Sequence, residues 1–132
     1  MRRILKVIVL PAVILAASLV PRLDAQGAPL VADVQRIIDG DTFVLRGEER
    51  RIRIWGLDAP ERNKAGGPAA THALRSLIAG QRLRCAVKDI DRYGRIVAQC
   101  VLPDGRDIAA AMIRGRVATE YCRYSRGYYG TC

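Results

Sequence analysis

The sequence is poor in the side chains that build transition-metal sites. It contains one histidine, His72, and no Cys-x-x-Cys pair. A structural zinc site needs four Cys or His ligands at short, regular spacings. We therefore regard zinc as the weaker interpretation of the four cysteines, and we expect His72, which falls in a predicted helix, to have a surface or structural role.

The sequence also lacks internal repeats and any composition typical of a disordered chain, collagen or a coiled coil. Half of its 132 residues are hydrophobic, which is enough for a real core. A chain of this length builds one compact domain and not two.

Lysine is scarce, but arginine is not. The 22 Lys and Arg residues outnumber 13 Asp and Glu, which gives a formal net charge of +9, and the only lysines are Lys6, Lys64 and Lys88. A small basic domain attracts polyanions such as nucleic acid or an anionic membrane surface. Arginine suits bidentate phosphate contacts, although a GC-rich coding bias explains the surface arginines equally well.

The N-terminus has the pattern of a secretory signal. A basic start precedes an apolar run over residues 7–20, and Ala25 offers a small residue at a cleavage position. We predict a signal peptide over residues 1–25 and a domain over residues 26–132. The run is short for a membrane span, so we expect an exported protein, periplasmic or secreted, with no stable span after cleavage. An uncleaved anchor is the alternative.

An even number of cysteines in an exported chain predicts two disulfides, for which three pairings exist. The order of the chain favours Cys85–Cys100 and Cys122–Cys132. Closing a loop of about 15 residues stabilises a fold by about 3 kcal/mol in the chain-entropy model.

Alternating and β-branched runs, separated by Gly- and Asp-containing turns, predict five short strands. They cover residues 31–38, 42–45, 51–55, 83–87 and 96–101. The first three form a meander. The last two form a hairpin that would bring Cys85 opposite Cys100.

Two short helices complete the pattern. Pro68 can open a helix that runs to Ala79, and Asp107 can cap a second one that ends at Arg114. Five strands with a helix between the third and the fourth are compatible with a small Greek-key barrel. The predicted fold is mainly β with helices: a five-stranded OB-fold-type Greek-key barrel plus two short helices.

Three segments combine acidic residues with arginine: residues 38–42, 53–61 and 91–95. Taken singly, each has an ordinary explanation as a turn, a loop start or a solvated strand position. Their occurrence together, in this order, favours a chemical site.

The residue types in these segments suit phosphate chemistry at a hard cation. Asp41 and Asp58 stand at the ends of two strands of one meander and offer oxygen ligands suited to calcium or magnesium. Glu61 could act as a general base on a water molecule at that ion. Arg53 and Arg95 could neutralise the charge that develops on a phosphate.

The three segments together resemble the staphylococcal nuclease family. They contain Asp-Gly-Asp-Thr, Arg-x4-Asp-x-Pro-Glu and Asp-x-Tyr-Gly-Arg in the family's order, and the resemblance covers residues 34–121. It implies a calcium-dependent nuclease that hydrolyses phosphodiester bonds of DNA and RNA with little sequence specificity. The expected products carry a 3′-phosphate and a 5′-hydroxyl, and the protein is expected to be a monomer.

The resemblance also implies a role for each matching residue. Ca²⁺ would be held by Asp41, Asp58 and the backbone carbonyl of Ala59, with Asp39 in the outer shell.

In the same comparison, Arg53 and Arg95 would bind the scissile phosphate, and Glu61 would activate or orient the water. Tyr93 and Tyr121 match family tyrosines near the nucleotide, one close to a phosphate and one against a base.

Two departures from the family stand out. Ala59 replaces a threonine, which keeps the carbonyl but removes a hydroxyl. The sequence ends at Cys132 without the family's C-terminal helix, and our hypothesis is that the two disulfides partly replace its stabilising role.

The last residues interleave tyrosine with arginine: Tyr124, Tyr128 and Tyr129 alternate with Arg123 and Arg126. This pattern is typical of a stacking platform for single strands, and a tail closed by a disulfide explains it equally well. The alternative functions are a non-catalytic OB-fold nucleic-acid-binding module and a small secreted structural protein. The complete set of acidic and arginine residues disfavours both.

Overall fold

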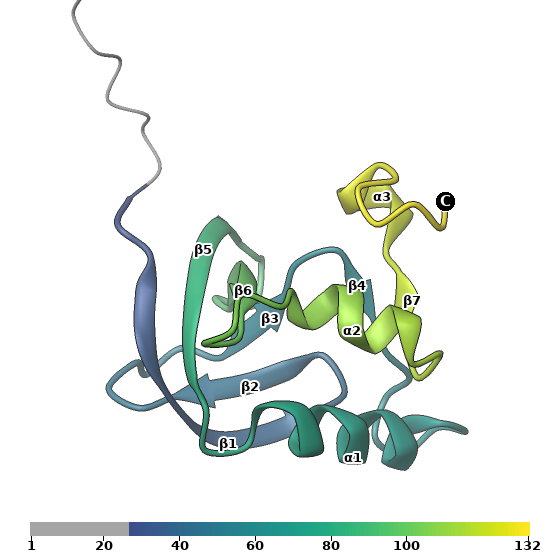
Figure 1. Cartoon of the computed structure of the whole chain (residues 1–132), viewed down its shortest axis with the longest axis horizontal. Helices are drawn as coiled ribbons and strands as arrows, with labels where there is room; N and C mark the ends of the chain where they lie inside the picture. Colours follow the sequence, from purple (N-terminus) through teal and green to yellow (C-terminus); the bar gives the residue numbers. More distant parts are fainter. Residues whose placement is uncertain (1–26) are drawn as a thin grey trace, which may run out of the picture.

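Five strands close into a barrel in the order β1-β2-β3-β6-β5 (Figure 1). The computed structural model describes residues 27–132, and the predicted signal peptide lies outside the described residues. The barrel strands are β1 (Leu30–Asp39), β2 (Thr42–Leu45), β3 (Ile52–Ile54), β5 (Arg82–Ile90) and β6 (Ile96–Val101). Each overlaps a predicted strand, and the predicted fold class is confirmed.

The closure of the barrel depends on one parallel pair. Strands β1, β2 and β3 form the predicted antiparallel meander, and β5 and β6 form the predicted hairpin. Strand β3 then pairs with β6 in parallel, and β1 pairs with β5 in antiparallel fashion. These two long-range pairs remove the sheet edges. They also fix the positions of the β1–β2 turn, the end of β3 and the β5–β6 turn relative to one another.

A second, two-stranded sheet was not predicted. It pairs β4 (Leu57–Asp58) with β7 (Thr119–Glu120), and its register sets Asp58 opposite Thr119. Two residues of strand are too few to leave a sequence signal of their own. The pairing nevertheless ties the segment that carries Asp58 to the C-terminal part of the chain.

In the described part of the chain, three helices lie outside the barrel: α1 (Gly67–Ile78), α2 (Ile108–Arg114) and α3 (Cys122–Ser125). The first two match the predicted helices, and the Asp107 carboxylate caps α2 by accepting a hydrogen bond from the N–H of Ala110 at 3.0 Å. Helix α3 is an addition of four residues. Within residues 27–132, no helix combines the length and apolar character needed to cross a membrane.

The core fills the barrel and the space under α1 and α2. The fully buried large side chains come from all of these elements and include Phe43, Leu45, Ile52, Ile54, Leu57, Leu74, Ile78, Leu83, Ile96 and Ile108. Burial of this apolar surface, at about 25 cal/mol per Å² removed from water, drives the closure of the barrel. The acidic and arginine segments are thereby fixed at the ends of packed strands.

Both predicted disulfides are present. Cys85 and Cys100 are direct neighbours in the β5–β6 ladder, with their Cα atoms 4.1 Å apart, and Cys122 is joined to Cys132. None of the cysteines in the described part of the chain is free. All four sulfur atoms are consumed in this way, which contradicts the zinc interpretation.

Candidate active site

One cleft of about 800 Å³ is lined by every residue to which the sequence assigns a role in catalysis, metal binding or nucleotide binding. It is bounded by the β1–β2 turn, the segment after β3, the β5–β6 turn and the start of α3. The predicted residues that line it are Asp39, Asp41, Arg53, Asp58, Ala59, Glu61, Tyr93, Arg95 and Tyr121. Residues that are up to 82 positions apart in the chain thus share one surface.

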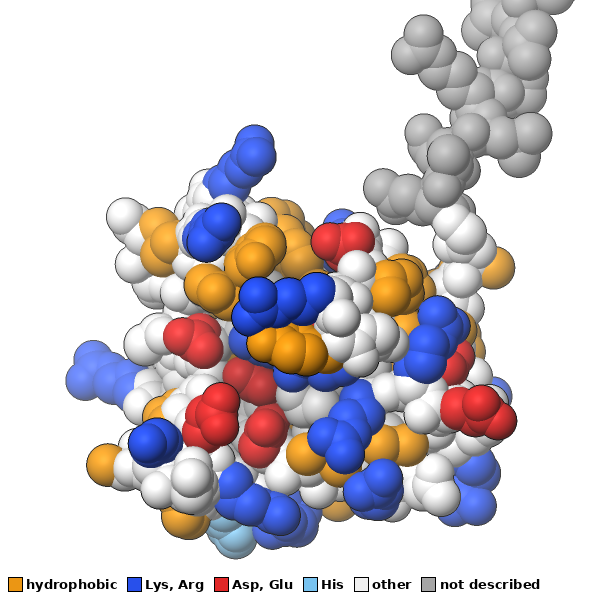
Figure 2. All heavy atoms as spheres, turned by 180° about the vertical axis from the view of Figure 1, so that it is seen from behind, with side chains coloured by type: hydrophobic (Ala, Val, Ile, Leu, Met, Phe, Trp, Pro, Cys, Tyr) orange, Lys and Arg blue, Asp and Glu red, His pale blue; other side chains and the backbone are white. Residues whose placement is uncertain are grey.

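The lining alternates in charge. The lining contains acidic residues from both halves of the domain together with Lys88, Arg92 and Arg123. Figure 2 shows a face with the same alternation, on which acidic side chains gather in a hollow and Lys and Arg side chains surround them. An acidic centre with basic borders can hold a cation in the middle and polyanion phosphates around it.

Asp41 is the buried carboxylate of the cleft. Its Oδ2 accepts a hydrogen bond from the N–H of Ala59 at 3.0 Å, and its Oδ1 accepts one from the Thr42 hydroxyl at 3.0 Å. Burial raises the pKa of Asp41 to about 6, although the Arg53 guanidinium and the Ala59 N–H act in the opposite direction. A further positive charge nearby would stabilise the ionised form of this carboxylate, which burial disfavours.

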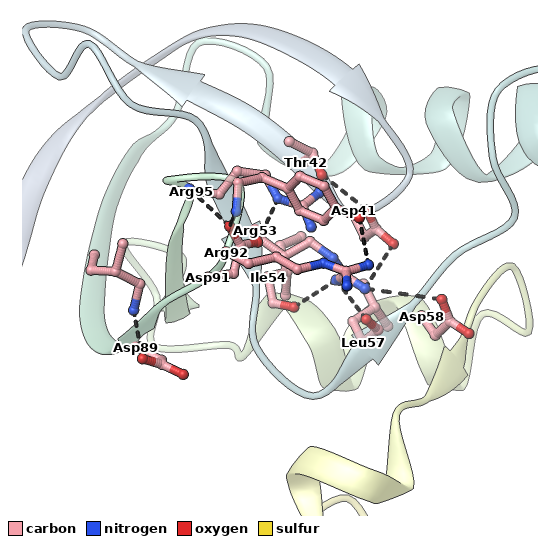
Figure 3. Close-up of polar contacts among 12 residues, drawn as sticks. Asp41, Thr42, Arg53, Ile54, Leu57, Asp58, Asp89, Asp91, Arg92 and Arg95 are labelled. Carbon is pink, nitrogen blue, oxygen red and sulfur yellow. Dashed lines mark hydrogen bonds and ion pairs between the residues drawn. The ribbon is translucent and has the colours of Figure 1, made fainter.

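Arg53 links the two predicted metal ligands (Figure 3). Its Nη2 lies 3.3 Å from Oδ2 of Asp41 and 3.9 Å from Oδ1 of Asp58. Its Nη1 donates to the carbonyls of Ile54 and Leu57, at 2.9 and 2.6 Å. The alternation around β3 predicted that Arg53 leaves the apolar face. The structure adds that its side chain is only 12 % exposed and is held from two sides.

The donor set suits a hard divalent cation. Asp41 and Asp58 converge on the same guanidinium, and Ala59 follows Asp58 directly, so that its backbone carbonyl belongs to the same segment. All candidate ligand atoms are oxygens, which calcium and magnesium prefer over nitrogen and sulfur. Burial and the raised pKa of Asp41 supply a physical reason for a cation to bind here.

Glu61 is exposed at the border of the cleft, and a tight backbone contact holds its segment. Gly67, the first residue of α1, packs so closely that a Cβ atom there would come within 1.9 Å of the Glu61 carbonyl oxygen. Only glycine fits this position. The packing of the α1 N-terminus against the Glu61 backbone therefore fixes the position of Glu61 at the cleft.

Gly40 plays a similar part for Asp41. A Cβ atom at Gly40 would lie 2.7 Å from Cβ of Ala70 and 2.8 Å from Cβ of Ala59. The absence of a side chain lets the β1–β2 turn approach α1 and the segment after β4. The close packing that Gly40 and Gly67 permit has no signal in a single sequence.

Arg95 occupies the opposite border of the cleft, at the β5–β6 turn. Its Nε donates to Oδ2 of Asp91 at 2.6 Å, and Oδ1 of Asp91 accepts the backbone N–H groups of Tyr93 and Arg95. Burial raises the pKa of Asp91, but these hydrogen bonds outweigh it and lower that pKa. Asp91 thus positions Arg95, a role that the sequence analysis did not assign.

Tyr93 is exposed beside this arginine, and its ring carries Arg95 at 5.3 Å and Arg92 at 4.8 Å. Tyr121 lies on the third border and packs edge-to-face against Tyr124, with ring centroids 4.7 Å apart. Both tyrosines therefore line the cleft where a nucleotide could reach them.

A second group of possible ligand atoms does not form a metal site. Glu120, Cys122 and Cys132 lie close together, but the two sulfur atoms are bonded to each other. The Glu120 carboxylate is fully used by hydrogen bonds from Ser125, Tyr129 and Thr131. This cluster holds the end of the chain and leaves the cleft as the candidate site.

The chain is similar in sequence to known proteins. Residues 51–130 match the family described as "Staphylococcal nuclease homologue". An uncharacterized endonuclease of Escherichia coli is 36 % identical over 94 residues, which cover 70 % of this chain and 61 % of the relative. Micrococcal nuclease of Shigella flexneri is 32 % identical over 125 residues, which cover 87 % of this chain and 69 % of the relative.

Thermonuclease of Staphylococcus intermedius is 35 % identical over 81 residues, which cover 54 % of this chain and 48 % of the relative. The chain spans about three fifths of the Escherichia coli endonuclease's length (61 %).

Proposed function

The chain belongs to the staphylococcal nuclease family, and on that basis we propose that it is a calcium-dependent nuclease that hydrolyses phosphodiester bonds of DNA and RNA with little sequence specificity. One observation carries the proposal. A single guanidinium, that of Arg53, lies between the carboxylates of Asp41 and Asp58 in a cleft that Glu61 and Arg95 also line. This is the combination that a phosphate, a cation and a water molecule need at one place.

Asp41, Asp58 and the carbonyl of Ala59 are proposed to hold the metal ion. Oxygen ligands alone favour calcium or magnesium, and calcium is our choice because of the family resemblance. When bound, the ion would supply positive charge next to the phosphate oxygens. Asp39, whose Oδ1 accepts the N–H of Asp41 at 3.1 Å, would orient the β1–β2 turn and stay in the outer shell.

Arg53 and Arg95 are proposed to seat the scissile phosphate. Arg53 is already held by two backbone carbonyls, so its guanidinium has little rotational freedom left to lose when a substrate binds. Arg95 is held in the same way by Asp91. Two preorganised guanidinium groups stabilise the charge that develops on the equatorial phosphate oxygens, and each is worth about 3 kcal/mol of barrier.

Glu61 is proposed to accept a proton from the attacking water. The new bond forms between the water oxygen and phosphorus, the bond between phosphorus and the 5′-oxygen breaks, and the leaving 5′-oxygen takes a proton from a solvent water molecule. The products then carry a 3′-phosphate and a 5′-hydroxyl. Because Glu61 is exposed, a substrate must close over it before the carboxylate works in a water-poor environment.

Tyr93 and Tyr121 are proposed to contact the nucleotide from opposite borders of the cleft. The basic surroundings would supply salt-sensitive affinity for the sugar–phosphate backbone without reading the bases. We further propose that the protein acts outside the cytoplasm as a monomer. Two disulfides support an oxidising compartment.

Digestion of denatured DNA tests the proposal. We expect cutting in calcium and none in a chelator, and we expect Glu61→Gln and Arg95→Ala to lower kcat by about 100-fold or more. Glu49→Gln and Arg84→Ala are the matched controls, because both residues are exposed and lie outside the cleft lining. A folded protein that binds DNA in calcium and never cuts it would replace the proposal with the binding-module alternative.

A further inference from the structure

One border of the cleft is formed by the end of the chain. We call residues 121–132 the C-terminal loop; it comprises α3 and the turn that returns to Cys132 (Figure 1). Three of its side chains, Tyr121, Arg123 and Tyr124, line the cleft. The family resemblance assigns a place to Tyr121 only, so the presence of Arg123 and Tyr124 in the lining needs its own explanation.

The C-terminal loop is closed on itself twice. The Cys122–Cys132 disulfide joins its ends. The Glu120 carboxylate, just before it, accepts four hydrogen bonds of 2.6 to 2.9 Å, from the Ser125 hydroxyl, the Tyr129 N–H and both the N–H and the hydroxyl of Thr131. A loop with these constraints holds its side chains in place before any ligand arrives.

Tyr129 anchors the C-terminal loop to the rest of the domain. Its hydroxyl donates to the Asp107 carboxylate at 3.0 Å, and its ring packs against Trp55 with centroids 6.0 Å apart. Gly56 makes this approach possible, because a Cβ atom there would lie 2.9 Å from the Tyr129 ring. The N–H of Tyr121 also donates to the Gly56 carbonyl at 2.8 Å.

Tyr124 does not take part in the hydrogen bonds that anchor the C-terminal loop. Its side chain makes no hydrogen bond within residues 27–132, and the residue is 55 % exposed. One edge contact with Tyr121 orients its ring, and the Arg123 guanidinium lies 5.9 Å from the ring centroid. A large ring that is oriented but uncovered loses little conformational entropy on binding and offers a flat apolar surface.

The cleft supplies the charge that such a ring needs to bind nucleic acid. Lys88 lines the cleft and lies 5.3 Å from the Trp55 ring centroid, and Arg123 lies beside Tyr124. Aromatic rings interleaved with basic side chains are the usual surface for single strands, whose unpaired bases stack while their phosphates pair with the cations. A duplex keeps its bases stacked on each other and offers no free face to the ring.

We propose that Tyr124 and Arg123 form a binding subsite for an unpaired nucleotide next to the scissile phosphate, with the base stacked on the Tyr124 ring and a backbone phosphate paired with Arg123. The proposal rests on the proposed function, since the scissile phosphate is taken to lie at Arg53 and Arg95. It makes the C-terminal loop a selectivity element that favours single-stranded over duplex substrates. The Cys122–Cys132 disulfide and Glu120 hold that element in position.

Equilibrium binding in a chelator and at low salt tests the subsite without any cleavage. The probes are a fluorescently labelled single strand of eight thymidines and a labelled duplex, measured by anisotropy. We expect Tyr124→Ala to weaken binding of the single strand by about tenfold and to leave duplex binding unchanged within about twofold, whereas Tyr124→Trp keeps the single-strand affinity. Arg123→Ala should weaken both, because it removes a phosphate contact.

Tyr128→Ala is the matched control. Tyr128 is in the same loop and is 63 % exposed, and its ring packs against Trp55 and Tyr129, but it lies outside the cleft lining, so Tyr128→Ala controls for the loss of an aromatic ring from the loop. In calcium, Tyr124→Ala should raise KM for denatured DNA by a similar factor and leave kcat unchanged. Equal effects of Tyr124→Ala on single-strand and duplex binding, or equal effects of Tyr124→Ala and Tyr128→Ala on single-strand binding, would overturn the subsite.

The two proposals fail separately. A protein that binds the single strand through Tyr124 but does not cut in calcium keeps the subsite and loses the nuclease assignment. If the protein cuts in calcium and the Tyr124→Ala variant has the same KM as wild type, the nuclease assignment stands and the subsite is refuted.

Discussion

Nη2 of Arg53 lies 3.3 Å from the carboxylate of Asp41, and the two side chains are only 12 % and 10 % exposed. The same guanidinium reaches Asp58 at 3.9 Å. A partly buried cation thus already neutralises part of the negative charge that a metal ion would otherwise meet. Burial nevertheless keeps the pKa of Asp41 raised to about 6, so one guanidinium does not fully compensate the pair, and an additional cation has a reason to bind.

Calcium should stabilise the folded protein through these carboxylates. At a free concentration of about 100 times the dissociation constant, linkage gives about 2.7 kcal/mol, which a thermal melt with and without chelator detects. Asp58→Asn should remove most of this shift, whereas Asp104→Asn should preserve it, because Asp104 is exposed and outside the cleft lining. An unchanged calcium shift in Asp58→Asn would exclude Asp58 as a ligand.

Gly67→Ala should disturb Glu61 without touching its side chain. The added Cβ would meet the Glu61 carbonyl oxygen at 1.9 Å, so the loop or α1 must move. We expect a loss of about 1 to 3 kcal/mol of stability and a fall in kcat larger than the rise in KM. Gly115→Ala is the control, because its φ is −72° and the nearest atom to its Cβ lies 3.4 Å away. Equal kinetics for the two variants would argue against this role.

Glu120 should make the stability of the C-terminal loop sensitive to acid. Burial raises the pKa of Glu120, but the hydrogen bonds from Ser125, Tyr129 and Thr131 outweigh it and lower that pKa from 4.5 to about 2. A depressed pKa contributes stability that is present above pH 4.5 and is lost as the pH falls towards 2.

Glu120→Gln should therefore lower the melting temperature at pH 7 and flatten its dependence between pH 5 and about pH 2. Glu48→Gln serves as a comparison, because Glu48 bonds only to the nearby Arg50. The same acid dependence in wild type and Glu120→Gln would show that other carboxylates cause it.

Tyr129→Phe should loosen the C-terminal loop from the barrel. The change removes only the hydroxyl that donates to Asp107, while the ring stays in place. A hydrogen bond to a charged group contributes about 1.5 to 3 kcal/mol, which urea unfolding resolves. Tyr128→Phe is the matched control, since the Tyr128 hydroxyl makes no hydrogen bond within the described residues. A loss that is equal in both variants would mean that the hydroxyl of Tyr129 contributes nothing specific.

Reduction of the disulfides should lower the melting temperature. The Cys85–Cys100 bond closes 15 residues of chain, for which the chain-entropy model gives about 3 kcal/mol. For a domain of this size that amounts to more than 10 °C, at about 4 to 8 °C per kcal/mol. An unchanged melting temperature in reductant would refute the hypothesis that the disulfides take over a stabilising role.

Much of the barrel could be predicted because its signals are local. The alternation around Arg53 marks β3, the Asp39–Asp41 turn separates β1 from β2, and Asp107 caps α2 through its neighbour Ala110. Each of these features depends on residues a few positions apart. Chain order favoured the observed disulfide pairing over two others for the same reason, since each bond closes a short segment.

The sequence predicted which segments contribute residues to the cleft, but it did not predict how their side chains are arranged. The three acidic and arginine segments pointed to Asp41, Asp58 and Arg95, but nothing in them predicts that Arg53 pairs with both metal-ligand candidates or that Asp91 holds Arg95. The tail gave two equal interpretations. In the structure, Tyr129 anchors the tail through Asp107, and Tyr124 lines the cleft.

By itself, the sequence determined which residue types the chain offers and where its strands turn, and it favoured one of three cysteine pairings, because these depend on neighbours in the chain. The tertiary structure alone decided the parallel β3–β6 pair, the short β4–β7 pair and the burial that raises the pKa of Asp41. These arise from packing between segments far apart in the chain. Their free energy belongs to the assembled core, and no single segment carries it.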